Sequence, residues 1–219
     1  MKNCIQIILK SIIVISFLSF LSCDQRNEGE KKSNSENLEN DQKILSLDTI
    51  KRISEGDENA KITIIAYESL TCGHCADFHK NVYPSLKKDF IEKGLVKIEF
   101  RHFPLDIAAF NASKIGQCRN DGNADVLNIL FSGQNKWARG KTPDESTKYL
   151  KKFLKDEGVT LDFEKCLTDK AIEDYVLNDR IEGAKKFKVN ATPTIIINEK
   201  KFEKTLNYKN LKKYLEKLI

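Results

Sequence analysis

The sequence predicts an α/β fold in which a partly parallel sheet carries a large helical insertion. A β-branched run at residues 61–67 (KITIIAY), an amphipathic helical pattern and an alternating run at residues 96–103 (VKIEFRHF) follow one another, which is the order of a βαβ unit. Residues 107–187 carry helical spacing without a strand-like run. A short strand pattern, TIIIN, then returns at residues 194–198.

The first 23 residues are typical of a signal peptide. Lys2 precedes an apolar run at residues 12–21, and a small residue stands before Cys23. This ending resembles a bacterial lipoprotein signal, in which Cys23 is lipidated and becomes the new N-terminus, although Phe20 departs from the usual pattern. Cleavage without lipidation and a retained anchor remain the alternatives.

The folded part of the chain is expected to begin after a polar linker. Residues 24–43 contain Leu38 as their only large apolar side chain, so they cannot bury enough surface to fold and are predicted to be disordered. Residues 44–219 then form the folded domain. The formal net charge is +5 with lysines interspersed among acidic residues, which does not indicate a nucleic-acid partner.

Each predicted element has a local signal. From Cys75 onward, apolar residues recur every three or four positions until near Gly94, and Pro84 should kink this helix. A crossover of this kind makes its two strands parallel. The helical insertion, at about residues 105–188, is expected to contain helices around residues 109–119, 124–133, 143–157 and 170–188. A turn at residues 199–201 leads into a brief strand, and an amphipathic helix at residues 206–219 closes the chain.

Cys72 and Cys75 are two residues apart at the predicted strand-to-helix junction. The free N–H groups and positive dipole end of the helix should stabilise a thiolate at Cys72. Cys75, one turn further on, is expected to be more buried and to resolve a mixed disulfide formed at Cys72. The ring of His74 is predicted to favour the thiolate, which would make the disulfide a stronger oxidant.

Two other interpretations of the cysteine pair remain open. The first is an inert structural bridge. The second is a metal site formed by Cys72, Cys75 and His79, as in a metal-binding surface lipoprotein. His79 is expected instead to lie on a surface face, and we predict that the protein needs no metal or other cofactor.

The run YESLTCGHCADFHKNVYPSLKKDF, followed by FRHFP and VNATPTIIIN, resembles the DsbA-like thioredoxin family of bacterial exported disulfide oxidoreductases over about residues 55–219. The resemblance implies a thioredoxin-like fold whose helical domain is inserted before a cis-proline strand. Cys72 matches the family's nucleophile and Cys75 its resolving cysteine. Pro193 matches the cis-proline, which would place the backbone of Thr192 beside the sulfur to hold a substrate.

The sequence departs from the family pattern at one position. Relatives often carry an acidic residue six positions before the first cysteine, where this chain has Ala66. Glu68 lies two residues later and shares a strand face with that position. It is therefore a candidate for the buried proton acceptor of Cys75, with a solvated side chain at the strand end as the alternative.

The remaining cysteines also suggest pairing. Cys4 lies in the leader, and Cys23 is the lipidation candidate. The other four cysteines are an even number, as disulfide pairing in an exported chain requires. Some relatives carry a second, non-catalytic bridge in the helical part, where Cys118 and Cys166 lie. Two free thiols and a regulatory redox pair are the alternatives to a structural disulfide.

The leading functional hypothesis is an exported oxidoreductase, periplasmic or in the cell envelope, that introduces disulfides into cysteine-containing exported proteins. A membrane partner would reoxidise it, and a lipidated Cys23 would anchor it to the membrane. A reductase or isomerase would use the same residues, because the pattern of residues does not set the reduction potential.

Overall fold

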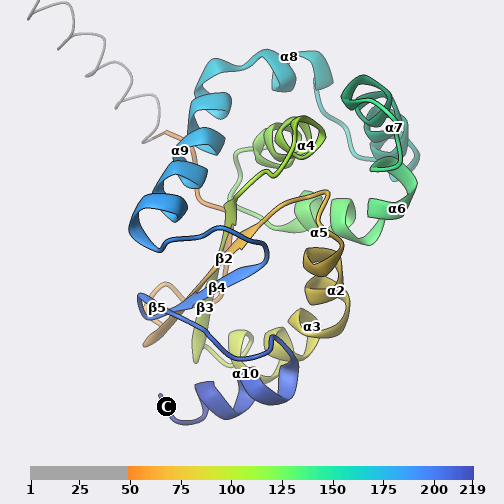
Figure 1. The fold of residues 1–219 in the computed structure, drawn as a ribbon. Helices are drawn as coiled ribbons and strands as arrows, with labels where there is room; N and C mark the ends of the chain where they lie inside the picture. The colour runs from red at the N-terminus through yellow and green to blue at the C-terminus, as the bar shows by residue number, and fades with distance from the viewer. Residues whose placement is uncertain (1–48) are drawn as a thin grey trace, which may run out of the picture. The chain divides into compact units, whose positions relative to one another are not determined.

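A mixed β-sheet organises the part of the chain that the structure describes. The computed structural model describes residues 49–219, within which one sheet has the strand order β1-β3-β2-β4-β5 (Figure 1). The strands are β1 (Ser54–Glu55), β2 (Ile62–Glu68), β3 (Val96–His102), β4 (Thr194–Ile197) and β5 (Lys200–Lys201). The β2 and β3 strands are parallel, which confirms the predicted βαβ unit, and the other pairs are antiparallel.

Several sequence predictions fall outside the described residues. These are the signal peptide at residues 1–23, the linker at residues 24–43 and lipidation at Cys23, all of which stay predictions. Within residues 49–219, no helix is both long enough and apolar enough to cross a membrane.

The connection between β2 and β3 is a broken helix. It consists of α2 (Gly73–Asn81), α3 (Tyr83–Leu86) and a π-helical turn, η1 (Lys87–Ile91). Pro84 lies in the first turn of α3, where its missing N–H removes no hydrogen bond of the helix. The predicted kink near this proline is therefore confirmed.

The predicted helical insertion is present between β3 and β4. Its helices are α4 (Ile107–Gln117), α5 (Asp125–Ser132), α6 (Gln134–Trp137), α7 (Pro143–Asp156), α8 (Phe163–Thr168) and α9 (Lys170–Lys186), and α10 (Tyr208–Leu215) closes the chain. Figure 1 shows α4 to α8 gathered at one end of the sheet. The longer helices α4, α5, α7 and α9 match the predicted segments, whereas α6 and α8 were not predicted.

Both faces of the central strands are covered. On one face, Ala66 of β2 and Phe100 of β3 pack with Phe78 of α2 in the main hydrophobic core. On the other face, Tyr67 packs against Phe103 and Phe187, below α9. A Cβ at Gly183 of α9 would lie 2.7 Å from the Tyr67 ring, so this glycine allows the close approach of helix and sheet.

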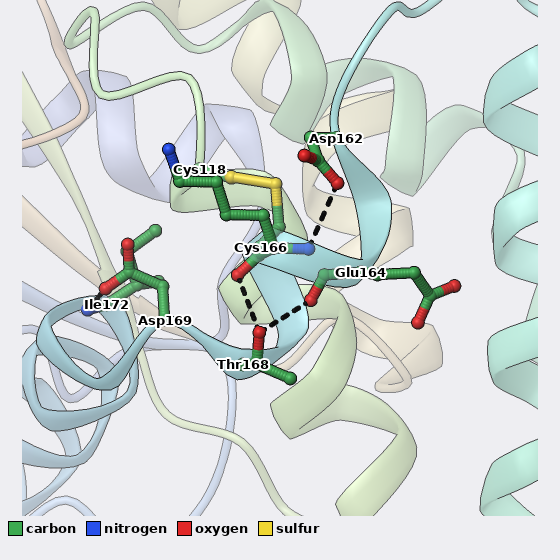
Figure 2. Close-up of a disulfide and its surroundings, with 8 residues drawn as sticks. Cys118, Asp162, Glu164, Cys166, Thr168, Asp169 and Ile172 are labelled. Atoms are coloured by element: carbon green, nitrogen blue, oxygen red, sulfur yellow. Dashed lines mark hydrogen bonds between the residues drawn. A yellow bond between two sulfur atoms is a disulfide. The ribbon is translucent and has the colours of Figure 1, made fainter.

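A disulfide joins two helices of the insertion. Cys118, the residue at which α4 ends, is bonded to the fully buried Cys166 of α8 (Figure 2). Asp162 caps α8 by accepting a hydrogen bond from the Lys165 N–H at 3.2 Å, and its carbonyl accepts one from the N–H of Cys166 at 2.9 Å. The bond thereby attaches a six-residue helix to the end of α4.

Candidate active site

The strand-to-helix junction after β2 places Cys72 at the N-terminus of α2. Cys72 is the N-cap residue, its backbone is extended, and no side chain caps the helix. The N–H groups of the first turn of α2 therefore stay directed at the space occupied by the Cys72 sulfur. In contrast, α4, α7, α8, α9 and α10 all begin at an Asp, Thr or Asn side chain that accepts a backbone hydrogen bond.

The surroundings of Cys72 favour its thiolate. A hydrogen bond from the Cys75 thiol is the largest cause that lowers the pKa of Cys72, and it outweighs partial burial. The Thr192 side chain and the backbone N–H groups of Cys75 and His74 lower it further, to about 5. At neutral pH the sulfur of Cys72 is therefore ionised and partly open to solvent.

The surroundings of Cys75 have the opposite effect. Its side chain is fully buried, and burial is the largest cause that raises the pKa of its thiol far above the ordinary range. The hydrogen bond to Cys72 and the nearby charge of Glu68 raise it further. One turn of α2 thus holds an ionised thiol and a protonated one.

The chain segment before β4 lies against Cys72. The Thr192–Pro193 peptide bond is cis, and the carbonyl oxygen of Thr192 lies 3.3 Å from the Cys72 sulfur, where it accepts a hydrogen bond when Cys72 is protonated. The Thr192 hydroxyl is buried, and its interaction with the Cys72 sulfur is one of those that lower the pKa of Cys72. Thr192 and Pro193 also line a cavity of about 560 Å³, together with His74 and Tyr208.

Glu68 and His79 form a buried pair beneath Cys75. Their side chains are 4% and 6% exposed, and the Nε2 atom of His79 lies 3.0 and 3.1 Å from the two carboxylate oxygens of Glu68. The prediction that His79 lies on a surface face was wrong, because α2 turns this residue toward the end of β2. Glu68 is likewise not solvated, whereas Ala66 is buried in the main core.

The fold has counterparts among known proteins. A family model described as Thioredoxin matches residues 48–217, which is more than half of the chain. The chain belongs to the DsbA-like thioredoxin-fold family. The thioredoxin-like fold with a helical insertion, predicted from the sequence, is thus confirmed.

Relatives of this DsbA-like chain include proteins of Rickettsia and Bacillus. A Rickettsia bellii protein, provisionally named a protein-disulfide oxidoreductase, is 30% identical over 150 residues, covering 65% of this chain and 55% of the relative. Disulfide bond formation protein D of Bacillus subtilis is 27% identical over 175 residues, covering 74% of each chain. The chain spans about half the length of the Rickettsia relatives that it matches.

Solved structures show the same fold. The crystal structure of alpha-DsbA1 from Wolbachia pipientis superposes with a TM-score of 0.68 at 28% identity, covering 79% of this chain and 95% of that one. The crystal structure of oxidised BdbD from Bacillus subtilis has a TM-score of 0.60 at 24% identity and covers 76% of this chain and 92% of that one.

His74 occupies an exposed position in this DsbA-like site. Its backbone N–H helps to lower the pKa of Cys72. No hydrogen bond joins its ring to Cys72 in the described structure, so the predicted role of the His74 ring stays a prediction.

Gln134 of α6 supports the active-site loop, a role that was not predicted from the sequence. Its Nε2 donates to the carbonyl of Leu70 at 2.8 Å and to the carbonyl of Cys72 at 3.0 Å. A glutamine in a polar run of the sequence carries no signal of this contact, since it depends on how the insertion packs against the loop. The insertion thus fixes the backbone on which Cys72 stands.

The candidate metal ligands are used in other contacts. His79 faces Glu68 through Nε2, and the hydrogen bonds of Cys72 are made to Cys75 and Thr192. Over residues 49–219, no group of three or more His, Cys, Asp or Glu side chains is placed so that it could hold a metal ion.

Proposed function

We propose that this protein is a thiol-disulfide oxidoreductase that introduces disulfides into other proteins. The observation that carries the proposal is the contrast between Cys72 and Cys75. The first sulfur is ionised and accessible beside Thr192 and Pro193, and the second is buried and protonated. Thiol-disulfide exchange needs this asymmetry, because a partner must reach one sulfur while the other completes the transfer.

In the proposed reaction, a substrate thiolate attacks the Cys72 sulfur of the oxidised protein. The Cys72–Cys75 bond breaks, and the electron pair and a proton end on Cys75. The carbonyl of Thr192 then holds the substrate backbone next to the cis-proline. A second substrate thiolate attacks the substrate sulfur and displaces Cys72 as a stable thiolate, so the substrate is oxidised by two electrons and the protein is reduced.

The stabilised thiolate supports the oxidising direction. Interactions that favour the Cys72 thiolate favour the reduced protein over the disulfide, and a disulfide whose reduced form is stabilised is a strong oxidant. The predicted contribution of the His74 ring would act in the same direction. A reductase or isomerase would use the same residues but needs a weaker stabilisation of Cys72.

We further propose that the protein is exported to the periplasm or cell envelope, acts on cysteine-containing exported proteins and is reoxidised by a membrane partner. The signal-like residues 1–23 support export, and Cys23 is the proposed lipidation site. The Cys118–Cys166 disulfide suits an oxidising compartment and has a proposed structural role. The proposed chemistry requires no metal or other cofactor.

Trapping of the mixed disulfide tests this function. A Cys75→Ala variant that carries glutathione in a mixed disulfide at Cys72 should exchange it for a peptide with a single cysteine and accumulate a one-to-one adduct at Cys72, because neither the protein nor the peptide offers a second thiol to resolve it. The oxidised wild-type protein and Cys72→Ser are tested with a two-cysteine form of the peptide. Peptide mapping by mass spectrometry identifies the linkage. The wild-type protein should instead release oxidised peptide, and Cys72→Ser should do neither. An adduct at any other cysteine, or none in Cys75→Ala, would contradict the proposal.

A further inference from the structure

The last part of the chain carries an excess of positive charge. Residues 184–219 contain ten lysines and three glutamates, with no arginine and no aspartate. In contrast, residues 49–183 contain 21 Lys and Arg residues against 22 Asp and Glu residues. The positive charge of the described chain is therefore concentrated after residue 183.

These lysines belong to three elements that meet at one edge of the sheet. The edge strand is β5, in which Lys200 and Lys201 are exposed (Figure 1). In the last turn of α9, Lys186 makes an ion pair at 3.0 Å with Glu199, in the turn between β4 and β5. The ring of Phe202, directly after β5, packs against Tyr214 of α10 with 5.4 Å between the centroids. The end of α9, the β5 strand and α10 are thus continuous.

Most of the positive charges at this edge are not neutralised. Six of the lysines are exposed and make no ion pair within residues 49–219, and we call the surface that they form the basic edge. These six are Lys185, Lys188, Lys200, Lys201, Lys213 and Lys217. By comparison, α7 and its C-cap contain four lysines and four acidic residues. Protection of an edge strand from pairing accounts for the lysines of β5, but not for those of α9 and α10.

The basic edge lies at the end of the sheet away from Cys72. The β2 strand runs toward Cys72, and β4 is antiparallel to it. Asn198, which follows β4, is hydrogen-bonded to Thr63 near the start of β2, at 3.0 Å through its N–H and at 2.9 Å through its side chain. The length of β2, about 20 Å, therefore separates the β4–β5 turn from the loop that carries Cys72.

The chemistry of the basic edge fits a surface that carries many negative charges. Lysine presents a hydrated point charge on a flexible stem, whereas the planar fork of arginine, which recognises a single carboxylate or phosphate group in two hydrogen bonds, is absent from residues 184–219. Leu218 and Ile219, which are 41% and 62% exposed, follow Lys217. Lysines beside exposed apolar side chains are the combination that binds anionic lipid surfaces.

We propose that the basic edge binds the anionic headgroups of a phospholipid bilayer, with Cys72 directed away from the bilayer. The proposal goes beyond the proposed disulfide exchange and does not depend on it, because the basic edge and the active site are at opposite ends of the sheet. In this orientation the Cys72 sulfur stays accessible to proteins in solution while the protein is held at the membrane surface.

Binding to vesicles tests the proposal. The full chain carries Cys23→Ser in all samples, so that no acyl chain can be attached there. It is sedimented with vesicles of phosphatidylcholine, either alone or mixed with the anionic lipid phosphatidylglycerol. The neutral vesicles measure the binding of apolar segments, residues 1–23 included, and the ratio of the two partition coefficients measures the electrostatic part. This ratio should be at least about ten and should fall toward one at high salt.

Two variants locate the attraction. The first removes four lysines of the basic edge and combines Lys185→Gln, Lys200→Gln, Lys201→Gln and Lys217→Gln. The matched control has the same net charge, because it removes four exposed lysines of α7 and combines Lys148→Gln, Lys151→Gln, Lys152→Gln and Lys155→Gln. The first variant should bring the ratio close to one, whereas the control should keep it within about threefold of the parent protein. Both should react with oxidised glutathione at the parent rate, which shows that they fold.

Three results would overturn the proposal. The first is a ratio near one in the parent protein, and the second is an equal loss in the two variants, because net charge alone would then explain the binding. The third is displacement of the protein from the vesicles by soluble polyglutamate at an equal concentration of charge, which would indicate an acidic protein as the partner.

A second measurement needs no lysine variant. An amine-reactive reagent modifies exposed lysines, and mass spectrometry maps the modified sites in the free protein and in the protein bound to anionic vesicles. The six lysines of the basic edge should become protected on the vesicles, whereas Lys148 and Lys155 of α7 should react as in the free protein. Protection of all lysines alike, or of α7 alone, would contradict the proposed orientation.

Discussion

The sulfur atoms of Cys72 and Cys75 lie one helical turn apart but have different surroundings. Backbone N–H groups and the Thr192 side chain favour the charge on Cys72, whereas burial and the charge of Glu68 disfavour a charge on Cys75. Because Cys75 stays protonated, its thiol is also available to donate to the Cys72 thiolate. The two pKa shifts therefore reinforce each other.

Alkylation of the reduced protein tests this asymmetry. Cys72 should react with iodoacetamide with a midpoint near pH 5, in line with a pKa lowered to about 5, and Cys75 should stay unlabelled in the native protein. Mass spectrometry of the modified peptides gives both results, with Cys72→Ser as the control. A midpoint near the ordinary thiol value of about 8.5 would contradict the prediction.

At the scale of elements, the helical insertion supports the loop between β2 and α2. Gln134 of α6 holds the carbonyls of Leu70 and Cys72, and Asp106, at the start of α4, accepts a hydrogen bond from Thr71 at 2.6 Å. The catalytic loop is therefore held by residues that follow it by more than thirty positions in the sequence.

Substitution of Gln134 tests this support. Gln134→Leu leaves two part-buried carbonyls without their donor and should lower the free energy of unfolding by about 1–3 kcal/mol. Urea denaturation measures the change, and Asn135→Leu, at the next and exposed position, is the matched control. A loss no larger than that of the control would show that the loop does not depend on Gln134.

The Cys118–Cys166 disulfide also acts between elements, because it joins the end of α4 to α8. Replacing both cysteines by alanine should lower the free energy of unfolding by about 2–4 kcal/mol, because the bond closes a long loop of the unfolded chain. The pH midpoint of Cys72 alkylation should not change, since this disulfide makes no contact with that sulfur. A shifted midpoint would favour a regulatory pair over the proposed structural one.

The elements differ in how far the sequence predicts them. Alternation and helical spacing extend over seven or more residues in β2, β3, α4, α7 and α9, and all of these were anticipated. The β1 strand and the α6 and α8 helices span two to six residues, too few to show a period. At the site, local spacing predicted the cysteine pair, and the family resemblance together with strand alternation suggested Glu68. The burial of His79 depends on α2, α5 and β2 meeting in the folded chain.

For the whole molecule, the state of Cys72 links folding to redox chemistry. Folding lowers the pKa of Cys72 to about 5, while the unfolded chain keeps an ordinary thiol. Between these values the unfolded chain binds more protons, so the stability of the reduced protein rises with pH. The stabilised thiolate exists only in the reduced protein. Folding therefore stabilises the dithiol relative to the Cys72–Cys75 disulfide.

Thermal unfolding at several pH values tests this linkage. The melting temperature of the reduced protein minus that of the oxidised protein should rise between pH 5 and about 8.5. The stabilisation by the thiolate is complete above about 8.5 and is lost as the pH falls through 5. The melting temperature of Cys72→Ser, which has no thiolate at this position, should lack the pH-dependent rise that the reduced protein shows. A difference that stays constant over this range would contradict the assignment of the thiolate to Cys72.

The reduction potential of the Cys72–Cys75 pair tests the central claim most directly. The purified protein is equilibrated in glutathione buffers, and mass spectrometry gives the fractions of dithiol and disulfide, with Cys72→Ser as the control. The account predicts a potential more oxidising than about −180 mV, in the range of protein oxidants. A potential near about −270 mV, the value for thioredoxin, or a pair that never exchanges, would contradict it.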